Sequence, residues 1–488
     1  MKPFNLFKEI TLLLIISLIA VSCAVNPVTG KTQLMLMSEG QEIQMGAQYD
    51  PQVIATFGEY KDEQILSFIQ GKADEMGKIS HRPNLQYHVK ILDSPVVNAF
   101  AVPGGYIYLT RGILAQFNNE AELMGVLGHE MGHITARHSV SNQSKQTLGQ
   151  LLLIGGMIAS EEFASYAQYA MQGMQLLFLK FSRDNERQAD HLGVAYSSQI
   201  GYDANKMADF FQVLKKMSLP DDQGGVPTFL STHPDPADRY NSVKRDAQMW
   251  QDSLKMDNYM VNADNYMHMI DGIIYGEDPR QGYVEGNNFY HPEMKFSFLY
   301  PAGWQFENLP IQVNMAPSDG KALIVFTSVS GSTLDEAANN ALQQLELKPK
   351  ESSRISINNF PAILTQSNQV YQDQSTGQQQ SNIIISCFIE YDKTYFVFHG
   401  VTAETDYNIY SDTFSSTFNT FSRLTDPAKL NRKPVKILVK KVQRTGTLAD
   451  ALKYYGVQQE KMNELALLNN LELTDAVQAG KLIKVTGY

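Results

Sequence analysis

The spacing of hydrophobic positions changes along this 488-residue chain, and each change predicts a different kind of structure. Up to about residue 280 the apolar positions favour helices. From about residue 283 they alternate with polar ones, as in Phe296 and Phe298, which predicts strands. The pattern therefore predicts a multidomain α+β protein. Its parts are a mainly helical domain at 24–280, a small α+β domain at 281–428 and a βααβ module at 434–488.

The clearest helix of the first domain opens at Asn119. Asn119 followed by Glu122 is a capping-box pattern. Gly125, Gly128 and Gly132 recur along the helix at a cost in helix propensity, which predicts close backbone packing or substrate approach. The apolar residues that place this helix partly in a core are Leu123, Met124, Val126, Leu127, Met131 and Ile134.

The same helix carries the pattern HExxH at His129, Glu130 and His133. The two histidines lie one turn apart on one face, so their imidazoles are able to hold one zinc ion. Glu130 lies beside them, where a carboxylate takes a proton from metal-bound water. The alternative is a surface helix that happens to carry two histidines, and the apolar surroundings argue against it.

A third ligand is expected in the helix-patterned stretch that follows Ser182. Glu186 and Asp190 are again one turn apart. We interpret Glu186 as the third zinc ligand, which leaves a fourth position open for catalysis. Asp190 would accept a hydrogen bond from a ligand imidazole and fix its tautomer. Taken alone, both residues would suit a solvated helix face; the HExxH pattern favours the metal.

These motifs resemble the periplasmic lipoprotein metalloproteases related to the heat-shock protease HtpX and the CAAX prenyl endopeptidases. The resemblance spans roughly residues 25 to 275 and implies a zincin-type peptidase with one zinc ion per chain. It implies the ligands His129, His133 and Glu186 and the catalytic carboxylate Glu130. Gln188 stands where the family often has a glutamate. The matching segments are Asn98–Gly105, Tyr106–Gly112, the HExxH helix with Ala136–His138, and Ser182–Asp190.

The resemblance also assigns a role to His233, which lies in a loop before Arg239. In related proteases a loop histidine approaches the zinc and occupies its open position, which implies latency. His233 would then inhibit, or it would stabilise an oxyanion as a catalytic residue. An ordinary loop histidine is the alternative. His138 and His191 are interpreted as structural.

The stretch from Asn98 to Tyr108 predicts an exposed strand followed by a turn at Gly104 and Gly105. A free strand edge beside the zinc would hold an extended peptide through main-chain hydrogen bonds. A hairpin within the core explains the same pattern equally well.

The N-terminus is typical of a bacterial lipoprotein. Lys2 and Lys8 precede an apolar run that ends in small residues before Cys23. We expect residues 1–23 to form a lipoprotein signal, with lipidation at Cys23. The chain would then face the periplasm from the outer membrane of a Gram-negative-type bacterium. The alternatives are an ordinary signal peptide or a short anchor, but the run is shorter than the ~20 residues that span a bilayer.

Composition narrows the remaining questions. The net charge of −11 argues against nucleic-acid binding. The chain has two cysteines; with Cys23 lipidated, Cys387 is left without an intrachain partner and is expected to be buried in an apolar run. A second apolar stretch, 148–159, is too short to span a membrane and is interpreted as a core helix or a lid.

The α+β domain is expected to contain a helix at 334–344 and a hairpin formed by 382–390 and 394–401. A polar loop is expected at 372–380. The segment from His291 to Trp304 is similar to the start of PsbP/Mog1-type domains. The domain shows no catalytic constellation in its sequence, so we interpret it as an interaction or structural module.

The C-terminal module resembles LysM modules, which bind the N-acetylglucosamine chains of peptidoglycan. The resemblance rests on Gly446-Thr447-Leu448, on Leu468–Leu471 and on Gly480–Val485. It makes peptidoglycan a possible partner. A small packing domain is the alternative.

Together these features predict a membrane-anchored zinc endopeptidase of the cell envelope. Its expected partners are unfolded or misassembled envelope proteins as substrates, and the membrane through Cys23. Two other classes of function stay open. One is a chaperone or scaffold lipoprotein with latent protease activity, and the other is a peptidoglycan-binding lipoprotein.

Overall fold

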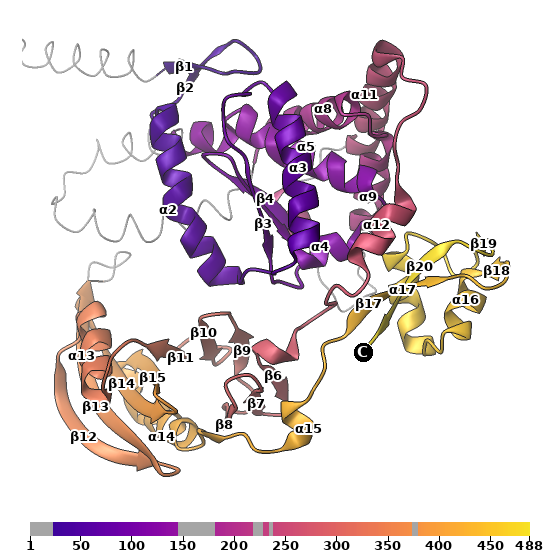
Figure 1. Cartoon of the computed structure of the whole chain (residues 1–488). Coiled ribbons are helices and arrows are strands. Elements are labelled where there is room, and N and C mark those ends of the chain that lie inside the picture. The colour runs from indigo at the N-terminus through magenta and orange to yellow at the C-terminus, as the bar shows by residue number, and fades with distance from the viewer. Residues whose placement is uncertain (1–22, 145–180, 218–227, 234–237, 373–378) are drawn as a thin grey trace, which may run out of the picture. The chain divides into compact units, whose positions relative to one another are not determined.

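The computed structural model describes residues 23–144, 181–217, 228–233, 238–372 and 379–488. Contacts within it divide the chain into two compact units (Figure 1). The first contains the chain up to Gly276 and, in addition, Lys436–Gly487; the second is formed mainly by Glu277–Val435. Three predicted features lie outside the described residues: the segment 1–22, the apolar stretch 148–159 and positions 373–378 of the polar loop.

The first unit is built on a three-stranded sheet of order β3-β5-β4. The helices α3 and α5 pack against this sheet, and α8, α9 and α11 gather beside α5 (Figure 1). A short hairpin of β1 (Cys23–Val25) and β2 (Thr32–Leu34) precedes them. The main elements are α2 (Glu39–Phe57), α3 (Glu63–Ile79), β3 (His88–Leu92), β4 (Ala99–Val102), β5 (Tyr106–Thr110), α4 (Arg111–Gln116), α5 (Glu120–Thr135), α8 (Arg183–Gln199), α9 (Asn205–Met217), α10 (Thr228–Thr232), α11 (Arg239–Leu254) and α12 (Ala263–Ile270).

The central helix α5 begins where its sequence predicts. The Asn119 side chain accepts a hydrogen bond from the Glu122 backbone N–H at 2.9 Å and so caps the helix. The glycines of α5 permit very close packing on α8. A Cβ added at Gly128 would lie 2.9 Å from the Gly193 carbonyl oxygen, and one at Gly132 would lie 3.1 Å from Ala189. The predicted close backbone approach is therefore present.

The predicted strand and turn form the hairpin of β4 and β5, in which Ala99 pairs with Leu109. Gly104 and Gly105 adopt φ values of 86° and 98°, which glycine adopts without strain. β4 lies at the sheet edge, yet all four of its residues are buried. The expectation of an exposed strand is wrong for this structure, and the alternative of a hairpin within the core agrees with the burial of β4.

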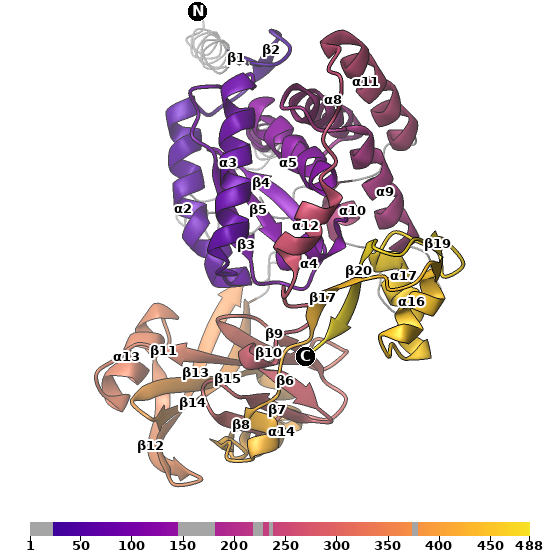
Figure 2. The same ribbon diagram turned by 45° about the vertical axis from the view of Figure 1, so that its right-hand side comes forward.

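The C-terminal segment has the predicted strand-helix-helix-strand order and belongs to the first compact unit (Figure 2). Its apolar residues join the same core as those of α3 and α5. Whether it is a separate functional domain stays a prediction. Its elements are β17 (Lys436–Lys441), β18 (Gly446–Thr447), α16 (Leu448–Tyr454), the 3-10 turn Gln459–Lys461, α17 (Met462–Leu468), β19 (Ala476–Val477) and β20 (Leu482–Gly487), with β17 and β20 antiparallel.

The second unit is built on a seven-stranded antiparallel sheet of order β12-β13-β14-β15-β11-β10-β9. α13 packs on one face, and α14 packs on the other within a core rich in phenylalanine. A four-stranded sheet, β16-β8-β7-β6, contributes to that second core. The strands are β6 (Tyr283–Glu285), β7 (Asn288–His291), β8 (Phe296–Leu299), β9 (Gln305–Asn308), β10 (Gln312–Ala316), β11 (Ala322–Val329), β12 (Pro349–Ile357), β13 (Phe360–Gln372), β14 (Gln379–Tyr391), β15 (Thr394–Ala403) and β16 (Ser422–Arg423). Its helical segments are Pro279–Gln281, α13 (Leu334–Gln344), Glu404–Asp406, α14 (Tyr407–Phe418) and α15 (Pro427–Leu430).

This unit carries the predicted elements at the predicted places. α13 covers the expected residues, and β14 and β15 form the expected hairpin around Asp392 and Lys393, both with positive φ. Cys387 is buried in the core, and burial raises the pKa of its thiol to about 12. Among the described residues, no helix is long and apolar enough to cross a membrane.

Candidate metal centre

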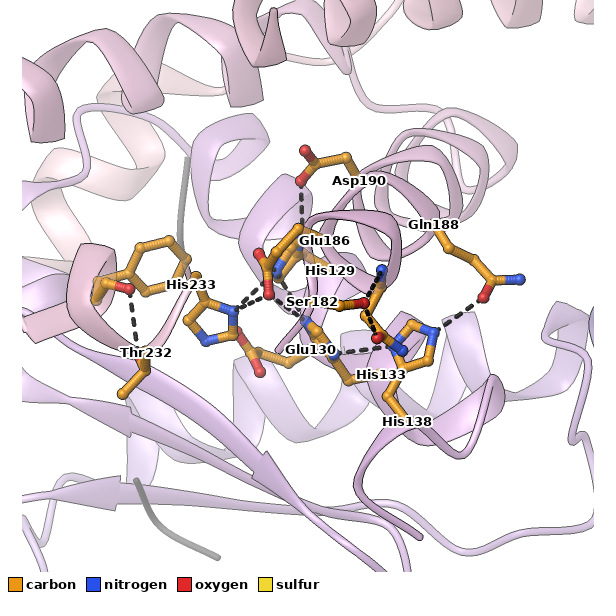
Figure 3. A network of polar contacts seen from close by, with 12 residues as sticks. His129, Glu130, His133, His138, Ser182, Glu186, Gln188, Asp190, Thr232 and His233 are labelled. Atoms are coloured by element: carbon orange, nitrogen blue, oxygen red, sulfur yellow. Dashed lines mark hydrogen bonds and ion pairs between the residues drawn. The ribbon is translucent and has the colours of Figure 1, made fainter. Parts of the chain in front are cut away.

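Four side chains from three segments of the first unit converge on one point (Figure 3). His129 and His133 come from α5, Glu186 from the first turn of α8, and His233 from the residue that follows α10. One ligand atom from each lies within 4.8 Å of the others, and all four residues are buried. The three predicted ligands are thus brought together. His233, which the resemblance placed at the open fourth position, lies among them.

The distances suit a tetrahedral cation. The Nε2 atom of His129 lies 3.1 Å from Nε2 of His133 and 3.3 Å from Nδ1 of His233. Glu186 Oε1 lies 3.2 Å from Nδ1 of His233 and 3.5 Å from Nε2 of His133. Zinc–ligand bonds of about 2.0–2.1 Å imply ligand separations of roughly 3.3 Å in a tetrahedron. The donor set therefore fits zinc without rearrangement.

The outer nitrogen of His129 is held as the sequence predicted. Its Nδ1 lies 2.9 Å from Oδ1 of Asp190, so Nδ1–H donates to the carboxylate and leaves Nε2 free for a metal. Arg239, the first residue of α11, lies 2.7 Å from the same oxygen and 3.6 Å from Glu186. Its guanidinium also stacks over Phe211. The positive charge of Arg239 thus offsets part of the negative charge around the ligands.

His133 has an outer partner that sequence reasoning missed. Nδ1 of His133 lies 3.0 Å from Nδ1 of His138, and Nε2 of His138 lies 2.9 Å from the Gln188 side-chain oxygen. If Nδ1–H of His133 donates to His138, then His138 donates from Nε2 to Gln188, and Nε2 of His133 is left for the metal. Arg137 adopts a φ of 55° between the helix and His138. This left-handed turn places His138 next to His133. No residue type in the segment predicts the turn.

Glu130 is a buried carboxylate beside the four ligands. Neither of its oxygens has a hydrogen-bond partner among the described residues, and Nε2 of His233 lies 3.6 Å from its Oε1. Burial raises the pKa of Glu130, which favours a group able to accept and return a proton. A buried carboxylate without partners is costly unless a ligand or a reaction uses it.

Burial and charge shift the pKa values of the clustered side chains in different directions. Burial lowers the pKa of His129, but hydrogen bonds and charge from Asp190 and Glu186 outweigh it and raise that pKa to about 9. Burial lowers the pKa of His133 well below 6.5. Burial raises the pKa of Glu186, yet the charge of His233 and the hydrogen bond from His129 hold it well below its usual value. A cation entering the site therefore competes with a proton on His129.

Comparison with known proteins agrees with this geometry. Residues 61–247 match the model of peptidase family M48. The chain is 28% identical over 229 residues to the beta-barrel assembly-enhancing protease of Yersinia pestis, covering 45% of this chain and 47% of that protein. It is 30% identical over 182 residues to the mitochondrial metalloendopeptidase OMA1 of Arabidopsis thaliana, covering 36% of each. The chain spans about a third to a half of the length of the curated relatives it matches.

Among solved structures, the chain is similar to the cyanobacterial PsbP of Synechocystis, with a TM-score of 0.22 and 9% identity over 29% of this chain and 94% of that one. The family match coincides with the residues that surround the metal centre. The buried cluster of three histidines and a glutamate lies within residues 61–247, the segment that is similar to the metallopeptidases of family M48.

Proposed function

We propose that the chain is a zinc-dependent endopeptidase with one zinc ion, held by His129, His133 and Glu186. The observation that carries this proposal is the convergence of four buried ligand atoms within 4.8 Å, beside the Glu130 carboxylate, which has no hydrogen-bond partner in the described part of the chain. All three imidazoles can present a free nitrogen inward while an acceptor lies near their outer nitrogen. Such consistent tautomers support a metal rather than a network of hydrogen bonds.

Each residue of the site has a separate role in peptide hydrolysis. Zinc, when bound, polarises the scissile carbonyl and lowers the pKa of a water molecule. Glu130 takes the proton of the attacking water and delivers it to the leaving amine. Asp190 holds His129 in the tautomer that binds the metal. All residues of β4 are buried. An extended peptide substrate can therefore pair with this strand only after the residues that bury it move.

His233 would close the metal site to water. With zinc held by His129, His133 and Glu186, His233 would supply a fourth protein ligand, a number typical of structural rather than catalytic zinc. We infer that His233 leaves the metal when a substrate binds, so the protease is latent until then. A chaperone or scaffold role with rare cleavage follows from the same closed site. In the open state His233 is alternatively an oxyanion donor.

The names of the relatives and the sequence of the N-terminus support a proposal for the substrates and the location. Relatives named beta-barrel assembly-enhancing proteases suggest protein quality control in the cell envelope. We propose unfolded or misassembled envelope proteins as substrates and attachment to the outer membrane, on its periplasmic side, through a lipid at Cys23. Mass spectrometry of the purified chain tests the lipid, since an unmodified cysteine at Cys23 would contradict it.

The first experiment measures bound zinc and cleavage of casein by the full chain, comparing wild type with Glu130→Gln and His233→Ala. Zinc should be present in all three. Cleavage should fall about 10²–10⁴-fold in Glu130→Gln, as for loss of a general base. Faster cleavage by His233→Ala would support latency, and slower cleavage would support a direct role in the reaction. Cleavage by Glu130→Gln at the wild-type rate would refute the assignment.

A further inference from the structure

One lysine of the C-terminal segment is fully buried. Lys484 lies in β20 with none of its surface exposed. Its ammonium donates to the carbonyl oxygens of Ala115 at 2.8 Å, Gln116 at 3.2 Å and Phe117 at 3.1 Å. An ammonium has three N–H donors, so three carbonyls use its full capacity. Lysine is rarely buried without such compensation.

These three carbonyls lie at the end of α4. The last four carbonyls of any helix lack partners within the helix, and a cation there also meets the negative end of the helix dipole. Tyr266 of α12 donates to the carbonyl of Leu114 at 2.6 Å. The end of α4 is therefore capped by two side chains from later segments, Tyr266 and Lys484.

The capped turn leads directly into the metal-binding helix. α4 ends at Gln116, and Asn119 is the N-cap of α5. Glu122, buried in the first turn of α5, accepts a hydrogen bond from the backbone N–H of Asn118 at 2.7 Å. Burial raises the pKa of Glu122 and lowers that of Lys484, while the charge of each opposes the shift of the other. The turn is thus held by Lys484 through three carbonyl oxygens and by Glu122 through the N–H of Asn118.

We propose that Lys484 is a positioning residue for the metal centre: it fixes the turn between α4 and α5 and so sets the place of His129, Glu130 and His133. The inference rests on the proposed function as a zinc peptidase. His129 follows Glu122 by seven residues, about 10 Å along a rigid helix. The β17–β20 segment lies next to α12 in the same unit (Figure 2). It then acts as part of the peptidase rather than as a detachable glycan-binding tail.

The test compares Lys484→Met with Lys441→Met in the full chain. Methionine keeps the apolar stem and removes the ammonium, and Lys441 is an exposed lysine on the paired strand. For Lys484→Met we expect kcat on casein, per zinc-loaded folded molecule, to fall about 10-fold with KM nearly unchanged, because small misplacements of catalytic groups cost up to about 10². Zinc affinity should weaken, and amide exchange in the first turn of α5 should accelerate. Lys441→Met should match wild type in all of these.

A double variant separates charge from folding. Glu122→Gln with Lys484→Met leaves no unpaired charge, so it should fold better than Lys484→Met alone. It should still show the lower kcat. If either variant only melts at a lower temperature, while kcat per zinc, zinc affinity and amide exchange stay at wild-type values, Lys484 is a structural residue and the inference is overturned. If wild type cleaves nothing, the proposed function fails, and zinc affinity and amide exchange still decide the role of Lys484.

Discussion

The first compact unit buries three histidines and two glutamates within a few ångströms of one another, whereas the second buries His399 singly. There the imidazole meets one polar partner, the Ser386 hydroxyl at 2.8 Å, and the ring of Phe388. Within the part of the chain that the structure describes, the cluster around His129 is the one group of at least three side chains able to hold a metal. Several buried ionisable side chains that converge on one point indicate a functional site. A single buried histidine with one hydrogen-bond partner indicates a structural role.

The largest effect should come from removing a charged ligand. Glu186→Gln takes the negative charge from the centre, so zinc affinity should fall by more than the roughly 10–100-fold that outer partners contribute. Cleavage should disappear with the metal. The measurement is zinc content after dialysis against a chelator. Asp184→Asn, an exposed carboxylate paired with Arg187 in the same helix, is the matched control and should keep its zinc.

A core substitution in the second unit should lower the stability of that unit and leave zinc affinity unchanged. Phe398 is fully buried among the rings of Phe298, Phe326 and Phe418. Phe398→Ala should destabilise this unit by about 3–5 kcal/mol through lost burial and the cavity left behind. Urea unfolding measures the loss. Zinc affinity should stay unchanged; if it falls together with stability, the two units are not independent.

A smaller effect on zinc affinity is expected from removing a residue that contacts a metal ligand but not the metal. Asp190→Asn weakens the acceptor for Nδ1–H of His129, so zinc affinity should fall about 10–100-fold. Chelator competition measures it. Asp246→Asn offers a matched control, because Asp246 pairs with the exposed His191 at 3.1 Å. Equal zinc affinity in both variants would contradict the role of Asp190.

The smallest effect is expected on the stability of the second unit when the pH is lowered. Burial lowers the pKa of His399 to about 4, so between pH 6.5 and 4 the unfolded state binds a proton that the folded state does not. The stabilising contribution is present above about pH 6.5 and is lost as the pH falls towards 4. By pH 5 this proton should cost the second unit about 2 kcal/mol. His291 of the same unit, whose pKa burial also lowers to about 4, should add a loss of similar size. Fluorescence of Trp304 in a Trp250→Phe background reports it, and His399→Gln should abolish this part of the pH dependence.

Local patterns predicted much of what lies near in sequence. The N-cap at Asn119, the facing of His129 and His133, the helix at 334–344 and the hairpin around Asp392 are all present. Each depends on helical or strand periodicity and on turn residues within a short window. A contact of Asp190 with a ligand imidazole was also predicted, because one-turn spacing placed Asp190 on the same face as Glu186, and the structure shows that the imidazole is His129.

The sequence by itself thus determined which helices carry His129, His133 and Glu186 and that 382–390 and 394–401 form a hairpin, since periodicity decides which face is buried. Tertiary structure decided that His233 joins this cluster instead of being an ordinary loop histidine. It alone decided that His138 supports His133, that β4 is buried and that Lys484 caps α4. These contacts join residues that are distant in the chain or separated by a left-handed turn. Their formation depends on the packing of whole helices and strands, which no local pattern records.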